Sequence, residues 1–383
     1  MNDMRTDWRK LKEEMIAAAP GLGIDKLGVT TAEPFAELKE RLLRHRELGR
    51  ESGFEEPDLE LRTEPGLHMP EARSIIAIAV AYPSKLKNAP VSEPGKRRGI
   101  LARAAWGEDY HRALRRRLDK LSEWILERVP DAKLLPMVDT GALSDRAVAE
   151  RAGIGWSGKN CSVLTPELGS WVYLGEMITN LPLPPDVSLP DGCGDCTLCI
   201  DACPTGALVG PGQLDAQRCI SFVTQTKGIV EDEMMRKIGN RLYGCDTCQI
   251  VCPVNRKIDI RHHEELLPDP EVVKPLLRPI LKMGNREFRE KFGSSSAAWR
   301  GRKPIQRNAL IALGNFRDAE SAPDVAAVLR DDPRPELRAT AAWALGRIGS
   351  PEAIDALREA RDVETDASAL EAIGRALSPH GGA

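Results

Sequence analysis

The 383-residue chain lacks the features that would direct it into a membrane or out of the cell. It has no apolar run of about 18 residues, the length needed to span a bilayer. Its first residues, MNDMRTDWRKLKEEM, contain no apolar signal region. Together with cysteines that are expected to stay reduced, these absences predict a cytoplasmic protein.

Aromatic residues and net charge are also scarce. Aromatic residues make up 4% of the chain, which disfavours an extensive stacking surface for single-stranded nucleic acid. The net charge is −3, so a polyanion would have to bind at a local basic patch. No GxGxxG motif follows a predicted strand, and GxxxxGK[ST] is absent, so nothing indicates a dinucleotide or a nucleoside triphosphate.

Eight of the nine cysteines lie between Cys193 and Cys252, in two runs with one cysteine between them. The first run, CGDCTLCIDACP, has the spacing by which bacterial two-cluster ferredoxins bind two 4Fe-4S clusters. The second run, CDTCQIVCP, lacks the first cysteine of that pattern, and Cys219 is the obvious replacement. One predicted ligand set is Cys193, Cys196, Cys199 and Cys252. The other is Cys203, Cys219, Cys245 and Cys248.

Two other structures can use such an array of cysteines. A disulfide framework is typical of small secreted domains, which this long chain does not resemble. Paired zinc sites are an alternative because CxxC pairs also build tetrahedral zinc sites, although the CxxCxxC loop and the CP endings favour iron–sulfur clusters. Cys161 lies outside both runs and is interpreted as a small, partly buried residue.

Three regions follow one another along the chain. The first, up to about residue 185, alternates helical and strand patterns as α/β or α+β domains do. Asp139 ends one of its predicted strands, where a sheet commonly presents side chains to a ligand. Helices are predicted at 8–23, 33–49, 109–129 and 141–155, and strands at 26–31, 74–83 and 132–140.

The last region is rich in alanine, leucine and arginine. Leu313–Gly314 and Leu345–Gly346 recur in equivalent places, and a second amphipathic segment follows each of them. Helix pairs that repeat in this way stack into an α-solenoid. The pattern predicts a short HEAT-like array of two full units and a remnant.

A bare ferredoxin needs far fewer residues than this chain, so the first region is expected to bind the electron acceptor. Several segments, taken together, resemble the epoxyqueuosine reductases over nearly the whole chain. AGIGWSGKN and the shortened second cysteine run separate the sequence from ordinary ferredoxins. The segments are YHRALRRRL, VDTGALSDRAVAERAGIGWSGKN, GSWVYLGEMIT, CGDCTLCIDACPTGAL and YGCDTCQIVCPVN.

The resemblance implies a cobalamin-dependent oxidoreductase that reduces epoxyqueuosine to queuosine at the wobble position of tRNA. An external donor of the flavodoxin or ferredoxin type would supply the electrons through two 4Fe-4S clusters. Base-off cobalamin without a protein histidine ligand is implied, which agrees with the absence of a DxHxxG motif. The implied fold is α+β, with an α/β cobalamin-binding domain (1–185), a ferredoxin-like cluster module (186–260), and a linker plus all-α HEAT-like repeats (261–383). We expect a monomer.

The resemblance also implies roles for single residues. Asp139 is the implied proton donor, which would require burial to raise its pKa; the alternative is that it caps the following helix. Arg62 is implied to line the cobalamin site, where it would pair with a propionamide or a phosphate. Tyr110 and His111 begin a helix near this site, although such a histidine is more often structural. Further cofactor-binding candidates are Lys159, Asn160, Ser221, Asp246 and Thr247.

The segment WRGRKPIQRN forms a basic cluster at the start of the repeats. Such a cluster would bind tRNA phosphates in a salt-sensitive manner that is blind to sequence. The alternative is an ordinary solvated face. Recognition of the single-stranded anticodon loop is expected because the base must reach the cofactor. The candidate residues are Arg300, Arg302, Lys303 and Arg307.

Two other functions stay open at this point. The chain could be a corrinoid iron–sulfur reductase of a small molecule, similar to a reductive dehalogenase. It could also be an electron carrier without a catalytic site, in which the repeats would be docking surfaces.

Overall fold

The computed structural model describes residues 6–378, which form two compact units. The first unit contains the chain up to Ser84, Glu108–Gln217 and Thr247–Leu267. The second contains Lys85–Gly107, Arg218–Asp246 and the chain from Pro268 onward. Each unit therefore combines segments that are distant in sequence. The predicted division into three consecutive domains did not include such combinations, and it remains a prediction. Among residues 6–378, no helix has the length and apolar character needed to cross a membrane.

A four-stranded antiparallel sheet forms the centre of the first unit, in the order β1-β2-β7-β4. Every residue of β2 is buried, which explains its run of isoleucine, valine and alanine. In the register of the sheet, Glu176 of β7 lies opposite Ala77 of β2 and Met137 of β4. The strands are β1 (Lys26–Thr31), β2 (Ser74–Ala81), β4 (Leu134–Met137) and β7 (Val172–Thr179).

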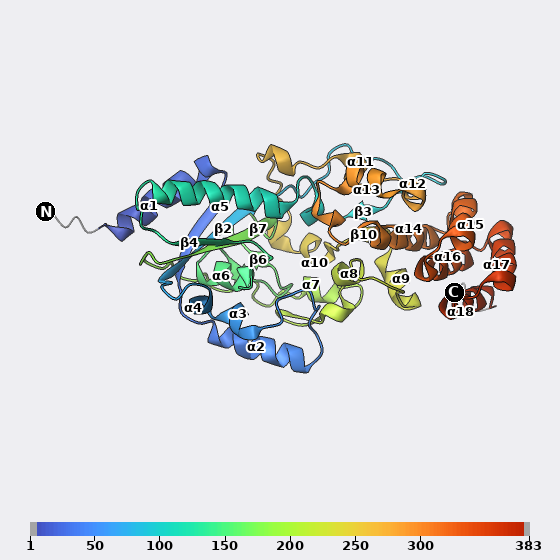
Figure 1. Ribbon diagram of the computed structural model, residues 1–383, viewed down its shortest axis with the longest axis horizontal. Coiled ribbons are helices and arrows are strands. Elements are labelled where there is room, and N and C mark those ends of the chain that lie inside the picture. Colours follow the sequence, from blue (N-terminus) through green and yellow to red (C-terminus); the bar gives the residue numbers. More distant parts are fainter. Residues whose placement is uncertain (1–5, 379–383) are drawn as a thin grey trace. The chain divides into compact units, whose positions relative to one another are not determined.

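Helices α5 (Tyr110–Leu126) and α6 (Asp145–Arg151) cover opposite faces of this sheet (Figure 1). The buried residues of α5 recur at helical spacing and include Leu114, Leu118 and Leu121. Helix α6 buries Val148 and Ala149 in the cluster of apolar residues on its side of the sheet.

The remaining elements of the first unit are peripheral or short. Helix α1 begins after Asp7, whose carboxylate accepts the Arg9 and Lys10 N–H groups, and its 3₁₀ extension ends at Gly23 with φ of 79°. These elements are α1 (Trp8–Ala18), α2 (Ala36–Glu47), α3 (Leu59–Thr63), α4 (Pro65–His68), α7 (Leu198–Asp201), α10 (Thr247–Ile250), β5 (Trp156–Ser157), β6 (Val163–Leu164), β8 (Leu208–Gly210) and β9 (Gln213–Leu214).

The second unit is mostly helical. A parallel strand pair joins β3 (Ile100–Leu101) to β10 (Arg241–Tyr243), which are distant in sequence. Its shorter helices are α8 (Ile220–Val223), α9 (Asp232–Ile238), α11 (Pro270–Val273), α12 (Leu277–Lys282) and α13 (Asn285–Phe292).

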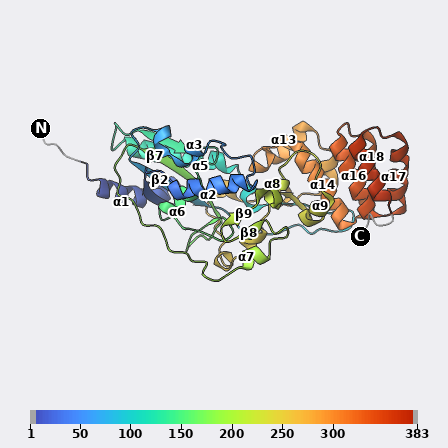
Figure 2. The ribbon, with the colours of Figure 1, turned by 90° about the horizontal axis from the view of Figure 1, so that it is seen from below.

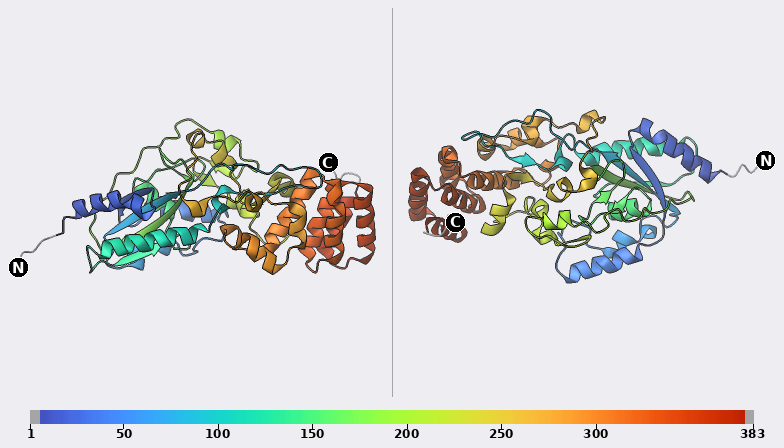
Figure 3. Two further views of the ribbon diagram at one scale, coloured as in Figure 1. Left: turned by 90° about the horizontal axis from the view of Figure 1, so that it is seen from above. Right: turned by 180° about the vertical axis from the view of Figure 1, so that it is seen from behind.

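The five C-terminal helices stack as the repeat pattern predicts (Figures 2 and 3). A Cβ atom on Gly314 would lie 2.9 Å from the Ala344 Cα atom, and one on Gly346 would lie 3.0 Å from the Ala376 Cα atom. The recurring Leu-Gly pair thus marks the places where successive helices approach too closely for a side chain. The helices are α14 (Arg302–Phe316), α15 (Ala322–Asp331), α16 (Pro335–Ile348), α17 (Pro351–Val363) and α18 (Ala367–Leu377).

Candidate active site and cluster cavity

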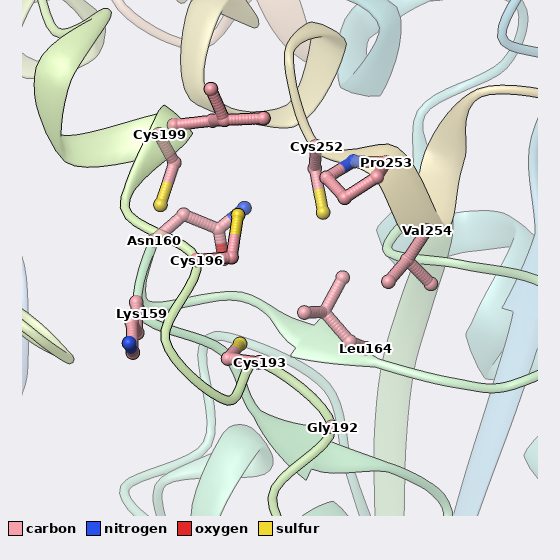
Figure 4. A pocket seen from close by; sticks show the side chains of 11 residues that line it. Lys159, Asn160, Leu164, Gly192, Cys193, Cys196, Cys199, Cys252, Pro253 and Val254 are labelled. Carbon is pink, nitrogen blue, oxygen red and sulfur yellow. The ribbon is translucent and has the colours of Figure 1, made fainter.

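The four cysteines of the first predicted ligand set line one cavity in the first unit. Three come from the run around α7, and Cys252 follows α10. Figure 4 shows their sulfur atoms around a common space, with Asn160 beside them. None of the four is in a disulfide. The cavity therefore offers the thiolate donors that a cubane requires.

Asn160 provides a second indication that this cavity suits a cluster. Its Oδ1 accepts the Ser162 N–H at 3.2 Å, whereas its buried Nδ2 has no hydrogen-bond partner among the described residues. A buried amide donor is expected to have an acceptor, and cluster sulfur can accept such a bond. Burial raises the pKa of the Cys199 and Cys252 thiols, and neighbouring thiolates raise it further. Iron would compensate this concentration of negative charge.

Lys159 contributes to the same loop without entering the ligand set. Its Nζ donates to the Gly194 carbonyl within the first cysteine run. Lys159 and Asn160 were both predicted to bind the cofactor. Their positions here favour a contact with the cluster region, and their functional roles remain predictions.

The second predicted ligand set is divided between the two units. Cys203 and Cys248 belong to the first unit, and Cys219 and Cys245 belong to the second. The Cys203 Sγ accepts the Ala207 N–H at 3.2 Å. Although burial acts to raise its pKa, backbone N–H groups around it lower the pKa overall, which favours the thiolate form that binds iron. This ligand set remains a prediction.

Asp139 lies just beyond the end of β4, with a side chain that is 58% exposed. Its φ is 38°, in the left-handed region that residues other than glycine rarely adopt. The alternative that Asp139 caps the following helix is wrong, because α6 begins at Asp145 with Ser144 as its N-cap residue. The Asp139 carboxylate is therefore available to face a ligand.

Two side chains from the start of α5 contact this carboxylate. The Tyr110 hydroxyl donates to Asp139 Oδ2 at 2.6 Å, and His111 Nε2 lies 3.3 Å from the same oxygen. The other ring nitrogen of His111 lies 2.7 Å from Asp109 Oδ1. Tyr110 stacks on His111 and on Tyr173, with ring centroids 4.1 Å and 5.0 Å apart. The arrangement is a carboxylate–imidazole–carboxylate chain that ends at Asp139.

The protonation states of His111 and Asp139 differ from the sequence-based expectation. The hydrogen bond to Asp109 and the nearby Asp139 carboxylate raise the pKa of His111 to about 9. The His111 interaction, with a further contribution from Tyr110, lowers the pKa of Asp139 below its ordinary value. The expectation that burial raises the pKa of Asp139 is therefore wrong for the described structure. At neutral pH the proton lies on His111, and Asp139 is ionised.

Sequence reasoning missed two acidic residues behind Asp139. Asp145 Oδ2 accepts the Asp139 N–H at 3.0 Å, and Glu176 of β7 is fully buried. Burial raises the pKa of Asp145 to about 6 and that of Glu176 well above its ordinary value. The only signal in the sequence was a glutamate inside the otherwise apolar strand segment VYLGEMIT.

Comparisons with known proteins agree with this site. An epoxyqueuosine reductase of Bacillus cereus is 58% identical over 371 residues, which cover 97% of this chain and 98% of the relative. Family models match at 62–140 (epoxyqueuosine reductase QueG, DUF1730), 192–255 (4Fe-4S double cluster binding domain) and 300–378 (HEAT repeats). The chain belongs to the epoxyqueuosine reductase family.

Two solved epoxyqueuosine reductases are also similar throughout. One, which contains an epoxyqueuosine-modified tRNA stem loop, has a TM-score of 0.94 and 57% identity. The other, from Bacillus subtilis, has its catalytic aspartate loop swung out of the active site, with a TM-score of 0.94 and 56% identity. Each comparison covers 96% of this chain and 98% of the other chain.

Several sequence-based predictions are confirmed by family membership and by the fold. The chain is an oxidoreductase with an α+β fold, a double 4Fe-4S cluster domain and HEAT repeats. Clusters in place of zinc follow from the 4Fe-4S domain match. The two other open functions, a small-molecule reductase and an electron carrier, do not describe this reductase family.

Arg62, whose predicted role is to hold an anionic group of cobalamin, has unused hydrogen-bond donors. Its guanidinium is half-buried in the first unit and has no hydrogen-bond partner among residues 6–378. Burial lowers its pKa, and the positive charge of Arg146 lowers it further. A phosphate or another polar group would satisfy these unbonded donors.

The other cofactor candidates have different surroundings. Asp246 is buried, and its Oδ2 accepts both the main-chain N–H of Arg103, at 3.0 Å, and the guanidinium, at 2.8 Å. This pairing supports a structural role for Asp246. Thr247 begins α10, and the carbonyl of Ser221 accepts a hydrogen bond from Gln225 within its own turn. The cofactor roles of these three residues remain predictions.

The predicted basic patch is only partly exposed. Arg307 is 2% exposed, and its guanidinium donates to the Val223, Thr226 and Gly228 carbonyls. The expectation that Arg307 belongs to a phosphate-binding surface is therefore wrong, because its donors are used inside the second unit. Lys303 forms an ion pair with Glu336.

The two remaining members of the patch are also bonded within the second unit. Arg302 donates to Asn285 Oδ1 at 2.7 Å, and Arg300 donates to the Gln225 carbonyl at 3.1 Å. For Arg300, Arg302 and Lys303, contact with tRNA remains a prediction.

Proposed function

We propose that this reductase converts epoxyqueuosine to queuosine at the wobble position of tRNA, the last step of queuosine biosynthesis. Two electrons and two protons open the epoxide and release its oxygen as water, which leaves a cyclopentene. Membership of the epoxyqueuosine reductases supports the substrate, and a proton-bearing side chain beside Asp139 supports the chemistry. The solved relative with a modified tRNA stem loop supports an anticodon-loop substrate.

Asp139 and His111 carry the proton step in this proposal. His111 is protonated at neutral pH because its pKa is about 9, and its Nε2 lies 3.3 Å from the Asp139 carboxylate. A proton that passes from His111 to Asp139 Oδ2 can continue to the epoxide oxygen as the ring opens. Tyr110 orients the accepting oxygen through its hydroxyl. Asp139 returns to the carboxylate form after the transfer.

Cobalamin, when bound, supplies the electron pair at the reacting carbon. Arg62 would hold an anionic group of the cofactor, and the cysteine-lined cavity of the first unit would hold the cluster that delivers electrons. The aspartate loop of the Bacillus subtilis relative has been observed out of its active site. By analogy, we propose that the Asp139 loop of this chain closes on the substrate.

The partners and the location complete the proposal. An external flavodoxin or ferredoxin would supply electrons, and the chain would act as a cytoplasmic monomer. Arg300, Arg302 and Lys303 would exchange their internal bonds for phosphates of the anticodon stem. Because such contacts release counterions, binding would weaken steeply as salt rises.

The decisive experiment is anaerobic reconstitution of the full chain with iron, sulfide and cobalamin. The reconstituted protein is given an epoxyqueuosine-bearing anticodon stem loop and a chemical reductant, and digested nucleosides are separated. Queuosine should appear only with cobalamin, and the protein should contain about eight irons. Zinc in place of iron, or no queuosine from a protein with full cofactor content, would refute the proposed function.

A further inference from the structure

Glu176 is an acidic residue in an apolar setting. It shares its face of β7 with Leu174 and Ile178, and α6 packs Val148 and Ala149 onto this face. Neither carboxyl oxygen of Glu176 accepts a hydrogen bond from any donor in the described part of the chain. An ionised carboxylate without donors is strongly disfavoured in such a place. Glu176 must therefore be neutral or share a proton.

Asp145 is the acidic neighbour that can share this proton with Glu176. Each carboxyl acts directly on the pKa of the other, and two carboxyl groups in contact can share a hydrogen bond only when one of them is protonated. Buried Asp145 Oδ1 has no other donor among residues 6–378. A single shared proton satisfies both side chains.

Charged neighbours do not remove the need for this proton. The charges that act on Glu176 are those of Asp145 and Asp139, and Asp139 also acts on Asp145; all are acidic. The nearby cations His111 and Arg146 act on Asp139. Two carboxyls in contact, without a cation of their own, cannot both be ionised.

The same pair holds the backbone of the proposed catalytic residue. Asp145 Oδ2 accepts the Asp139 N–H at 3.0 Å. Asp139 has a φ of 38°, and a residue stays in this unfavourable region only where its surroundings hold it. The hydrogen bond to Asp145 is the contact that fixes this peptide group.

We propose that Asp145 and Glu176 share one proton and that this pair holds Asp139 in its working position. Both are positioning residues, since neither has to touch the substrate. When the proton leaves, two buried negative charges repel each other, Asp145 moves away from Glu176, and the Asp139 peptide loses its support. The inference rests on the proposed function for its catalytic consequence and on geometry alone for the shared proton.

Three substitutions in the full-length holoenzyme separate the parts of the proposal. Asp145→Ala removes the acceptor of the Asp139 N–H. Asp145→Asn keeps an acceptor oxygen there and can donate to Glu176. Glu176→Gln replaces the shared proton with a permanent N–H donor. Glu150→Gln, on the same helix but bonded to Ser157, is the matched control.

The first readout does not depend on activity. The Asp139 amide should exchange its hydrogen slowly in the wild type and at least about tenfold faster in Asp145→Ala. Exchange protection of this amide, which is the rate corrected for base-catalysed intrinsic exchange, should fall in the wild type as alkaline pH removes the shared proton, whereas Glu176→Gln should keep its protection. An infrared band of a protonated carboxyl should be present in the wild type at neutral pH and absent from Glu176→Gln.

The second readout is single-turnover reduction of the stem loop across pH. Asp145→Ala should lower the rate about 10- to 100-fold with little change in KM, because misplacement of a catalytic group affects the reaction step. Asp145→Asn should recover most of the rate, and Glu176→Gln should lose the alkaline decline of the wild type. Glu150→Gln should behave like the wild type in all measurements.

Several outcomes would overturn the inference. They are slow Asp139 exchange in folded Asp145→Ala, an infrared spectrum that Glu176→Gln leaves unchanged, and an alkaline decline of exchange protection that Glu176→Gln retains. Should Asp145→Ala fail to fold, the last two comparisons still decide. If the wild type fails to reduce epoxyqueuosine while exchange and infrared results agree, the proposed function fails and the shared proton stands.

Discussion

The surroundings of Asp139 and the start of the repeats differ in how far their buried polar groups are hydrogen-bonded. Around Asp139, three buried carboxyl oxygens of Asp145 and Glu176 have no donor among residues 6–378, and the backbone adopts an unfavourable φ. At the start of α14, buried Arg307 and Asn308 donate to five carbonyl groups of the same unit. An unfavourable backbone conformation and carboxyls that depend on a shared proton thus lie at the reactive site, whereas Arg307 and Asn308 use their donors within the second unit.

If this comparison holds, substitution at Asp139 should affect turnover and leave stability almost unchanged. Asp139→Asn should reduce single-turnover reduction about 10²- to 10⁴-fold, the usual contribution of a proton-transfer group. Stability should be retained because asparagine tolerates the left-handed backbone better than most residues. Rapid-quench nucleoside analysis and urea unfolding measure the two effects.

Asp119→Asn, at an exposed site on the same helix as His111, is the control for this experiment. It should match the wild type in both measurements. Wild-type turnover in Asp139→Asn, with both cofactors bound, would remove Asp139 from the proton step.

The opposite result is expected at Arg307. Arg307→Met keeps most of the side-chain length but removes the guanidinium donor from the Val223, Thr226 and Gly228 carbonyls, which should cost about 2–3 kcal/mol of unfolding free energy. Turnover below the melting temperature should stay near the wild-type rate. Arg330→Met is the control, since Arg330 is exposed and pairs only with the adjacent Asp331. Unchanged stability together with weaker tRNA binding would show that Arg307 contacts tRNA and would contradict its structural role.

A pair of glycines tests the packing of the repeats at a smaller scale. Gly314→Ala should cost about 1–3 kcal/mol of stability, because the new Cβ would overlap the backbone of Ala344. Gly374→Ala lies in the middle of α18 with nothing within 4 Å of the new Cβ, so it should gain about 1 kcal/mol. Urea unfolding of both variants gives the comparison. Equal effects of the two substitutions would contradict close helix packing at Gly314.

The sequence predicted local elements well and long-range contacts poorly. Apolar runs and helical spacing located β2 and α5 to within a few residues, because both signals are local. The pairing of β3 with β10 has no such signal, since its partners lie far apart in the chain. A stretch of sequence also shows which residues are charged, but it does not show whether their side chains point to solvent or into the core. For this reason Arg307 resembled part of a surface patch, and the role of Glu176 was missed.

The smallest predicted effect concerns the charge on His111. Its pKa rises from 6.5 to about 9 in the folded chain, so its ion pairs add stability that is fully present below pH 6.5 and lost as the pH rises through about 9. Because the site is partly exposed, solvent screening should limit this contribution to about 1 kcal/mol or less. His111→Gln should therefore be less stable than the wild type at pH 6.5 and approach it above pH 9 in thermal melts. A difference in stability that stays constant with pH would indicate that the loss of stacking on Tyr110 causes it. That result would contradict a protonated His111 beside Asp139.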